Sequence, residues 1–234
     1  MEWVFGQRRL LWSDPTVVGS WHPSVMGILN VTPDSFYDGG HHEHIERALA
    51  RARLMADQGA AIIDIGGEST RPGAQRVSAD EEARRVIPII KALSATLDVA
   101  ISVDTSKAKV AALALEAGAD IVNDVTALTG DPGMIDVLAQ SKAGVILMHM
   151  RGTPLTMQQG DLSSDNIVEE VGQYLSRRLS DLDAAGISRD RVCLDPGIGF
   201  GKTCAQNLQL LVSMGPLRAL GRPLLSPLAD SLEA

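Results

Sequence analysis

The sequence predicts an α/β protein, a parallel barrel of about six and a half β/α units. Short apolar runs alternate with longer helical patterns, and these runs are continuously apolar, which is typical of parallel strands buried on both faces. Most runs end, on their C-terminal side, in a polar residue. A barrel collects its functional groups on that rim, whereas a doubly wound sheet concentrates them at one switch point. The pattern therefore favours an incomplete TIM barrel of the (β/α)8 type.

The predicted elements follow one another in order along the chain. Strands are expected at 25–31, 61–65, 99–103, 120–123, 144–148 and 191–194, and a seventh begins at 223–225. Helices are expected at about 44–58, 79–97, 107–117, 132–140, 165–185 and 204–220. Gly59, Gly118 and Gly186 follow three of these helices as stop signals. Ser78 and Glu81 have the spacing of a capping box before the second helix.

Length and composition indicate one domain over 1–234, with an N-terminal extension at 1–24 and a divergent tail at 226–234. The net charge is −8 and aromatic residues make up 3%, so we expect no nucleic-acid partner. No apolar run approaches the roughly 20 residues of a membrane span, and the N-terminus lacks a signal-peptide core, so we expect no membrane partner. Two cysteines form no disulfide framework. The chain is therefore expected to be soluble and cytoplasmic.

Polar residues at the predicted strand ends are the candidate binding groups. Carboxylates accept hydrogen bonds from N–H donors, and an asparagine both donates and accepts. A ring of Asp104, Asn123 and Asp195 therefore suits a flat, nitrogen-rich heterocycle, with Met148 as an adaptable apolar wall. The alternative is that each residue caps the next helix or holds a loop. Other polar groups on this rim are Asn30, Asp64, Glu68 and His149. His149 either helps to line the barrel mouth or has a structural role.

Two glycine-rich loops follow predicted strands. The loop at 66–73 carries Thr70 and Arg71, and an arginine there is a candidate clamp for a carboxylate or phosphate, with an ordinary solvent loop as the alternative. The segment 195–203 resembles a phosphate-binding Walker loop but has Pro196 where that pattern needs glycine. Phe200 in this segment offers a ring face to an aromatic substrate, or packs in the interior.

Three histidines, His41, His42 and His44, lie close together in the sequence. A metal site would need a further ligand, so we expect this cluster to lie in a solvated loop.

Several motifs together carry a family resemblance. They are Gly27-Ile-Leu-Asn-Val-Thr-Pro-Asp-Ser-Phe36 with Asp38-Gly-Gly40, Glu68-Ser-Thr-Arg-Pro-Gly-Ala74, Ser102-Val-Asp-Thr105, Val122-Asn-Asp124 and Leu194-Asp-Pro-Gly-Ile-Gly-Phe-Gly-Lys202. In this order they resemble the signatures of the dihydropteroate synthase family. The resemblance extends from about residue 26 to 225. It implies a transferase of folate biosynthesis that joins 4-aminobenzoate to a dihydropterin methyl diphosphate and releases diphosphate.

The same resemblance implies roles for individual residues. Asp104, Asn123 and Asp195 would hold the pterin, with Met148 nearby, and Asn30 would lie at a Mg2+–diphosphate site. Asp104 and Arg71 would act in catalysis. Thr70, Arg71 and Pro72 match a loop that closes over the substrates, and Phe200 matches a residue beside the aminobenzoate, where sulfonamides compete. The resemblance also implies a possible homodimer formed through the outer helices.

After residue 225 the sequence leaves the family pattern, which continues with a Ser-Arg-Lys motif and an Arg-x-His group. Both groups bind substrates in the family, so we expect the 234-residue chain to be weakly active or inactive. A frameshift in the gene is one explanation. Two alternative functions stay open. One is a methyltetrahydrofolate-binding domain of a corrinoid methyltransferase, and the other is an inactive remnant that binds pterin.

Overall fold

Six parallel strands form the centre of the molecule. The computed structural model describes residues 2–11, 23–31, 41–69 and 76–226. The strands pair in the order β3 (Val25–Asn30), β4 (Ala60–Gly66), β5 (Ala100–Asp104), β6 (Ile121–Asp124), β7 (Gly144–Met148) and β8 (Val192–Asp195). Spatial order equals chain order, so no strand order reverses as it would in a doubly wound sheet. The predicted barrel architecture is confirmed, and the strands are offset from their predicted bounds by one residue at most ends.

A seventh strand position begins beside β8, as predicted. Leu194 and Leu224 form a parallel bridge, in which Leu194 donates its N–H to Pro223 and accepts one from Leu225. The opposite edge of the sheet is β3, which pairs within the described residues with β4 alone. Ile28 on this edge is 61% exposed, although its register partner Asp64 is buried. The barrel is therefore open between β3 and residues 223–225.

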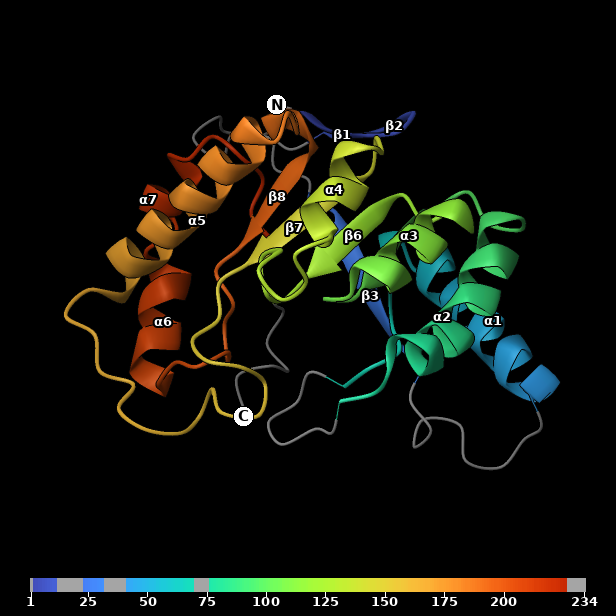
Figure 1. The fold of residues 1–234 in the computed structure, drawn as a ribbon, viewed down its shortest axis with the longest axis horizontal. Helices are drawn as coiled ribbons and strands as arrows, with labels where there is room; N and C mark the ends of the chain where they lie inside the picture. Colours follow the sequence, from blue (N-terminus) through green and yellow to red (C-terminus); the bar gives the residue numbers. More distant parts are fainter. Residues whose placement is uncertain (1, 12–22, 32–40, 70–75, 227–234) are drawn as a thin grey trace.

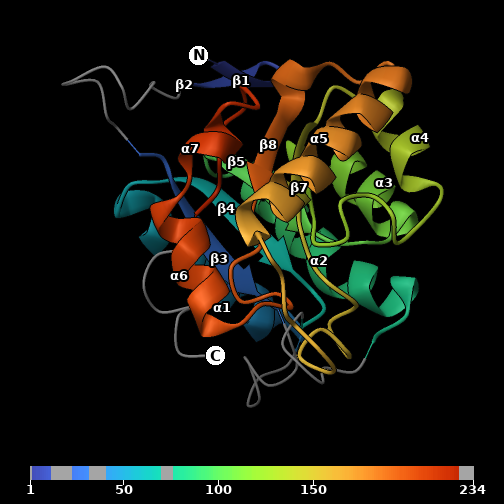
Figure 2. The ribbon, with the colours of Figure 1, turned by 90° about the vertical axis from the view of Figure 1, so that its left-hand side faces the viewer.

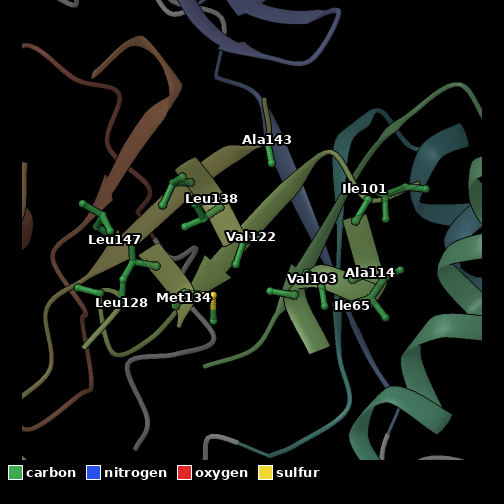
Figure 3. Packing of buried hydrophobic residues seen from close by; sticks show 14 of the residues in the cluster. Ile65, Ile101, Val103, Ala114, Val122, Leu128, Met134, Leu138, Ala143 and Leu147 are labelled. Atoms are coloured by element: carbon green, nitrogen blue, oxygen red, sulfur yellow. The ribbon is translucent and has the colours of Figure 1, made fainter. Parts of the chain in front are cut away.

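Helices cover the outer face of the strands (Figure 1). They are α1 (His41–Asp57), α2 (Ala79–Ser94), α3 (Ala108–Glu116), α4 (Met134–Ala139), α5 (Ile167–Ala184), α6 (Cys204–Val212) and α7 (Gly215–Arg218), with a 3-10 turn η2 (Arg189–Arg191) before β8. Their apolar sides form one core with the outward side chains of the strands, such as Ile65, Val103 and Leu147 (Figure 3). No described helix is long and apolar enough to cross a bilayer.

Three details of the helices differ from the sequence-based expectation. The predicted helix at 204–220 is two helices, because Pro216 at the start of α7 lacks the N–H that would continue α6. Ser78 caps α2 by accepting the N–H of Glu81, but the Glu81 carboxylate bonds Arg84 and Arg85 instead of completing the capping box. The histidine cluster lies in the first turn of α1, not in a loop, and its side chains lie outside the described atoms.

An N-terminal hairpin fills the end of the barrel at which the strands begin (Figure 2). Strands β1 (Glu2–Phe5) and β2 (Arg8–Leu11) pair antiparallel, and Trp3 and Phe5 are 4% and 0% exposed. The Trp3 indole donates to the carbonyl of Arg191 at 2.8 Å, just before β8. Both rings pack against inward side chains of the barrel strands: Ile62, Ala100, Ile121, Ile146 and Cys193. The sequence pattern predicts only an N-terminal extension at 1–24 for these residues.

The hairpin is expected to contribute strongly to stability. Phe5→Ala removes a fully buried ring and should lower the free energy of unfolding by about 3–5 kcal/mol. Urea unfolding followed by circular dichroism measures this change. Leu11→Ala, on the 71% exposed end of β2, is the control and should change stability by less than about 0.5 kcal/mol. Equal effects of the two substitutions would contradict the role of the hairpin as a plug.

Candidate active site

The C-terminal ends of the strands place polar groups on neighbouring positions of one rim. The register pairs Asn30 with Gly66, Gly66 with Asp104, and Asp104 with Asn123. On the other side, Met148 at the end of β7 pairs with Asp195 at the end of β8. Between these two groups, Asn123 pairs with Ile146, two residues before Met148. Parallel pairing therefore places the predicted binding residues of five strands at one end of the sheet. The hairpin fills the opposite end of the barrel, and the rim formed by these strand ends is called the mouth.

A buried hydrogen bond crosses the interior below this rim. The Asn123 amide on β6 donates to the Asp64 carboxylate on β4 at 3.0 Å, across the intervening β5. Asp64 is 4% exposed, and burial raises its pKa, while the hydrogen bond from Asn123 opposes that shift. This bond fixes the Asn123 amide so that its carbonyl oxygen faces away from Asp64. Asp64 was only one of the polar strand residues in the sequence analysis, and the structure makes it the partner that orients Asn123.

Asp104 lies in a field of negative charge. Burial raises its pKa well above the usual range, and repulsion from Asp64, Asp124, Glu82 and Glu68 raises it further. A ligand that offers N–H donors or positive charge relieves both effects, because it hydrogen-bonds to the carboxylate and offsets the repulsion. The electrostatics of the mouth therefore select a ligand rich in N–H groups.

The helix-capping alternative does not explain the ring. The N-caps of α3, α4 and α6 are Lys107, Gly133 and Thr203, so none of the three ring residues caps the helix that follows it. Asp124, in contrast, is a carboxylate with a structural role. It accepts hydrogen bonds from the Thr126 N–H, the Thr126 hydroxyl and the Leu128 N–H, and it holds the turn after β6.

Asp195 combines a ligand-facing position with one local bond. Its carboxylate accepts the Gly197 N–H at 2.6 Å. Burial raises the pKa of Asp195 to about 6, against the opposing effects of that N–H and of the Lys202 ammonium group. Gly197 has φ +67°, and a Cβ there would lie 1.9 Å from the His149 carbonyl oxygen. Only glycine allows the chain after Asp195 to approach β7 this closely.

The remaining predicted residues fall into three groups. Met148 is 3% exposed and packs against Gly197, consistent with an apolar wall, while Phe200 is partly exposed in the same loop. His149 is buried, its ring makes an edge contact with Tyr174, and burial lowers its pKa to about 3, so its structural alternative fits the geometry. Thr70, Arg71 and Pro72 lie outside the described residues.

The described residues on either side of 70–75 are joined through a residue that the sequence did not single out. Lys107 binds the carboxylates of Glu68 and Glu82, and Glu68 also accepts the N–H of Val77 at 3.2 Å. Glu68 precedes the loop and Val77 follows it. The partners of Lys107 are 25 and 39 positions away in the chain, so no local pattern predicts this cluster.

Asn30 is the candidate ligand for a cation. It is exposed at the end of β3, and its side-chain oxygen lies 3.5 Å from the point that a Cβ on Gly66 would occupy. An Asp104 oxygen lies 3.5 Å from the same point. The described residues contain no group of three His, Cys, Asp or Glu side chains suited to a metal. One or two side-chain oxygens fit Mg2+, which commonly keeps several waters and takes further ligands from substrate phosphates.

Taken together, the fold and the mouth define a barrel protein whose candidate ligand site lies at the C-terminal ends of the strands. The model of the family described as pterin binding enzyme matches residues 26–228. The chain belongs to this family.

Within this family, the chain is similar to proteins named dihydropteroate synthase. The chain is 50% identical to the dihydropteroate synthase of Synechocystis sp. over 205 residues, which cover 86% of this chain and 69% of the relative. It is 46% identical to the Escherichia coli (strain K12) dihydropteroate synthase over 204 residues, with 87% and 72% covered.

Solved structures agree with this result. A Yersinia pestis dihydropteroate synthase with a sulfonamide drug complex has a TM-score of 0.85 and 43% identity, with 96% of this chain and 78% of that chain covered. The Xanthomonas albilineans enzyme with 4-aminobenzoic acid has a TM-score of 0.78 and 47% identity, with 86% and 71% covered. The chain is thus similar to dihydropteroate synthases in sequence and in fold.

The raised pKa of Asp195 predicts a stability change with a defined sign. The folded-state pKa of Asp195, about 6, exceeds the unfolded value of about 3.9, so the folded state binds the proton more tightly. The stability that this proton contributes is therefore fully present below about pH 4 and is lost as the pH rises through about 6. Asp195→Asn, which mimics the protonated form, should therefore stabilise the ligand-free protein by about 1–3 kcal/mol at pH 8.

Urea unfolding at a series of pH values between 4 and 8 measures this effect. The gain from Asp195→Asn should shrink towards pH 4. A gain that does not vary with pH would contradict the assigned environment of Asp195.

Proposed function

We propose that the chain is a dihydropteroate synthase, which condenses 4-aminobenzoate with (7,8-dihydropterin-6-yl)methyl diphosphate to 7,8-dihydropteroate and diphosphate. One observation supports the proposal most directly: Asp104, Asn123 and Asp195 lie at the strand ends that form the mouth, and Asp64 orients Asn123. The similarity to proteins of that name supports the same reaction. Because these relatives are synthases, the corrinoid methyltransferase alternative is not favoured.

Pterin recognition follows from the donors and acceptors of the mouth. A pterin presents ring N–H groups and an amino group to acceptors and a carbonyl to a donor. The carboxylates of Asp104 and Asp195 accept hydrogen bonds, and the free part of the Asn123 amide completes the set. Met148, buried beside Gly197, supplies an apolar surface for the ring system. The ligand would also relieve the repulsion around Asp104.

The chemistry needs charge stabilisation more than a strong base. Departure of diphosphate from the methylene carbon leaves a positive charge that the pterin ring delocalises, and the Asp104 carboxylate stabilises this charge at short range. The neutral aromatic amine of 4-aminobenzoate then attacks the methylene carbon and loses a proton. In this proposal Phe200 lies beside the aminobenzoate ring, and Thr70, Arg71 and Pro72 bind substrate and help exclude water.

We also assign Asn30, with Asp104 beside it across Gly66, as the residues that would hold Mg2+. When bound, Mg2+ offsets the negative charge that builds on the departing diphosphate oxygens. Asn30 is exposed at the mouth, where the diphosphate of a bound pterin would lie.

Two further parts of the proposal concern the state of the protein. A homodimer formed through outer helices is supported by α6, which exposes Leu208 at 51% and Val212 at 83%. A cytoplasmic location is supported by Cys193 and Cys204, which are both free thiols.

The assay is direct. The chain is incubated with the dihydropterin diphosphate, 4-aminobenzoate and Mg2+, and products are separated by chromatography. Dihydropteroate should form at the low rate expected for the 234-residue chain, and Asp104→Asn should lower that rate about 100-fold. Asp136→Asn should leave the rate unchanged, since this residue lies on the exposed side of α4.

Calorimetry with the dihydropterin diphosphate separates the alternatives. Binding without turnover would leave a pterin-binding protein in place of a synthase. If no pterin binds, both the function and the role of the ring are refuted.

A further inference from the structure

We propose that Lys202 is a positioning residue of the substrate mouth: its ammonium group holds the loop 196–201 against the end of β7 and thereby sets the places of Asp195 and Phe200. The inference rests on the proposed function for the roles of those two residues. Lys202 itself has no substrate contact in the proposal, and it acts through the loop.

The geometry of Lys202 is that of an internal clamp. The side chain is 3% exposed, and its Nζ donates to three backbone carbonyls: Gly197 at 2.7 Å, Phe200 at 3.0 Å and His149 at 3.1 Å. An ammonium group has three N–H donors, so all of them are used by main-chain oxygens. Two acceptors lie within the loop, and the third lies directly after β7.

These bonds connect elements that carry different substrate residues. His149 follows Met148 at the end of β7, and the loop runs from Asp195 at the end of β8 to Phe200. The His149 N–H also donates to the Asp195 carbonyl at 3.0 Å, so the two strand ends are joined by the backbone as well. Lys202 extends that pairing beyond the strands, where the sheet no longer holds the chain.

The loop needs such a clamp because its backbone is unusual. Gly197, Gly199 and Gly201 all have positive φ, at +67°, +86° and +68°. Glycine loses more conformational freedom on folding than other residues, so a loop with three of them is costly to order. Other bonds assist at single points: Asn207 accepts the Gly199 N–H at 3.0 Å, and Gln158 donates to the Gly199 carbonyl at 3.0 Å.

Opposing effects act on the Lys202 ammonium group. Burial is the largest and lowers the pKa of Lys202 to about 7; Asp195 and Glu170 oppose this shift, and Arg151 adds to it. Arg151 forms a two-point ion pair with Glu170, which leaves Asp195 as the neighbouring carboxylate not already paired with an arginine. The imidazole of His149 is buried and neutral. Lys202 thus also balances the charge of the carboxylate that would bind pterin.

The test compares Lys202→Met with Lys91→Met, a matched change at an exposed lysine of α2. Hydrogen exchange of the ligand-free protein is measured first. Lys202→Met should speed exchange at least tenfold in 197–201 and leave β4 and α2 unchanged, whereas Lys91→Met should alter none of these segments. Unchanged exchange in 197–201 would overturn the proposal.

Ligand affinity is the second measurement. If Lys202 had only a structural role, its substitution would lower thermal stability but would leave the ligand affinity of the folded protein unchanged. Calorimetry is done at a temperature where both variants are folded. Compared with the unsubstituted chain, Lys202→Met should bind the dihydropterin diphosphate about tenfold more weakly, and Lys91→Met should bind it with unchanged affinity. Equal affinities would overturn the positioning role. If the unsubstituted chain binds no pterin, the proposed function fails, while the exchange result still shows whether Lys202 orders the loop.

A second variant covers failure to fold. Lys202→Gln keeps two N–H donors without the charge, so it should retain part of the loop order. Its hydrogen-exchange rates in 197–201 should lie between those of the wild type and those of a fully disordered loop. Wild-type exchange and affinity in Lys202→Gln would overturn the proposal.

Discussion

The in-register parallel pairing of β3 to β8 is the constraint on which the rest of this structure depends. It brings the C-terminal ends of the strands to one rim, where Asn30, Asp104, Asn123 and Asp195 lie within two residues of the same register level. Side chains alternate between the faces of a strand, so a slip of one residue would turn these groups outward into the helical layer. The helices, the hairpin and the loops all serve to hold this register and to leave one end open.

The buried carboxylates of the mouth destabilise the folded protein when no ligand is bound. Burial raises the pKa of Asp64, Asp104 and Asp195, so each carboxylate is less stable ionised here than in water. A ligand with N–H donors reverses much of that penalty by making the hydrogen bonds that water would make. The apolar layers around and below the mouth offset the rest: the helix-facing core on the outside and the Trp3–Phe5 plug at the other end.

Two lysines bind segments that follow this rim, and they do so differently. Lys107 is half-buried and binds the carboxylates of Glu68 and Glu82, so it joins the residues after β4 to α2 through ion pairs. Lys202 is buried and binds three carbonyl oxygens, so it holds the loop 196–201 through its backbone. In both cases the lysine comes from the segment after a strand that carries a rim carboxylate, Asp104 or Asp195. Positioning and charge balance of the mouth therefore depend on the same side chains.

The order of strands and helices, their parallel arrangement and the polar strand-end residues can be predicted from the amino-acid sequence, because apolar runs, helix stops and strand-end polar groups are local patterns. The break at Pro216 is also a local signal, although the predicted helix runs through it. Three features required the folded structure: Trp3 and Phe5 fill one end of the barrel, Asp64 orients Asn123, and Lys202 binds the backbone of a loop. The plug and the Asp64–Asn123 bond join residues far apart in the chain, and the clamp depends on where β7 lies beside β8. They exist only after the sheet has curved, so no periodicity or spacing within one segment carries them.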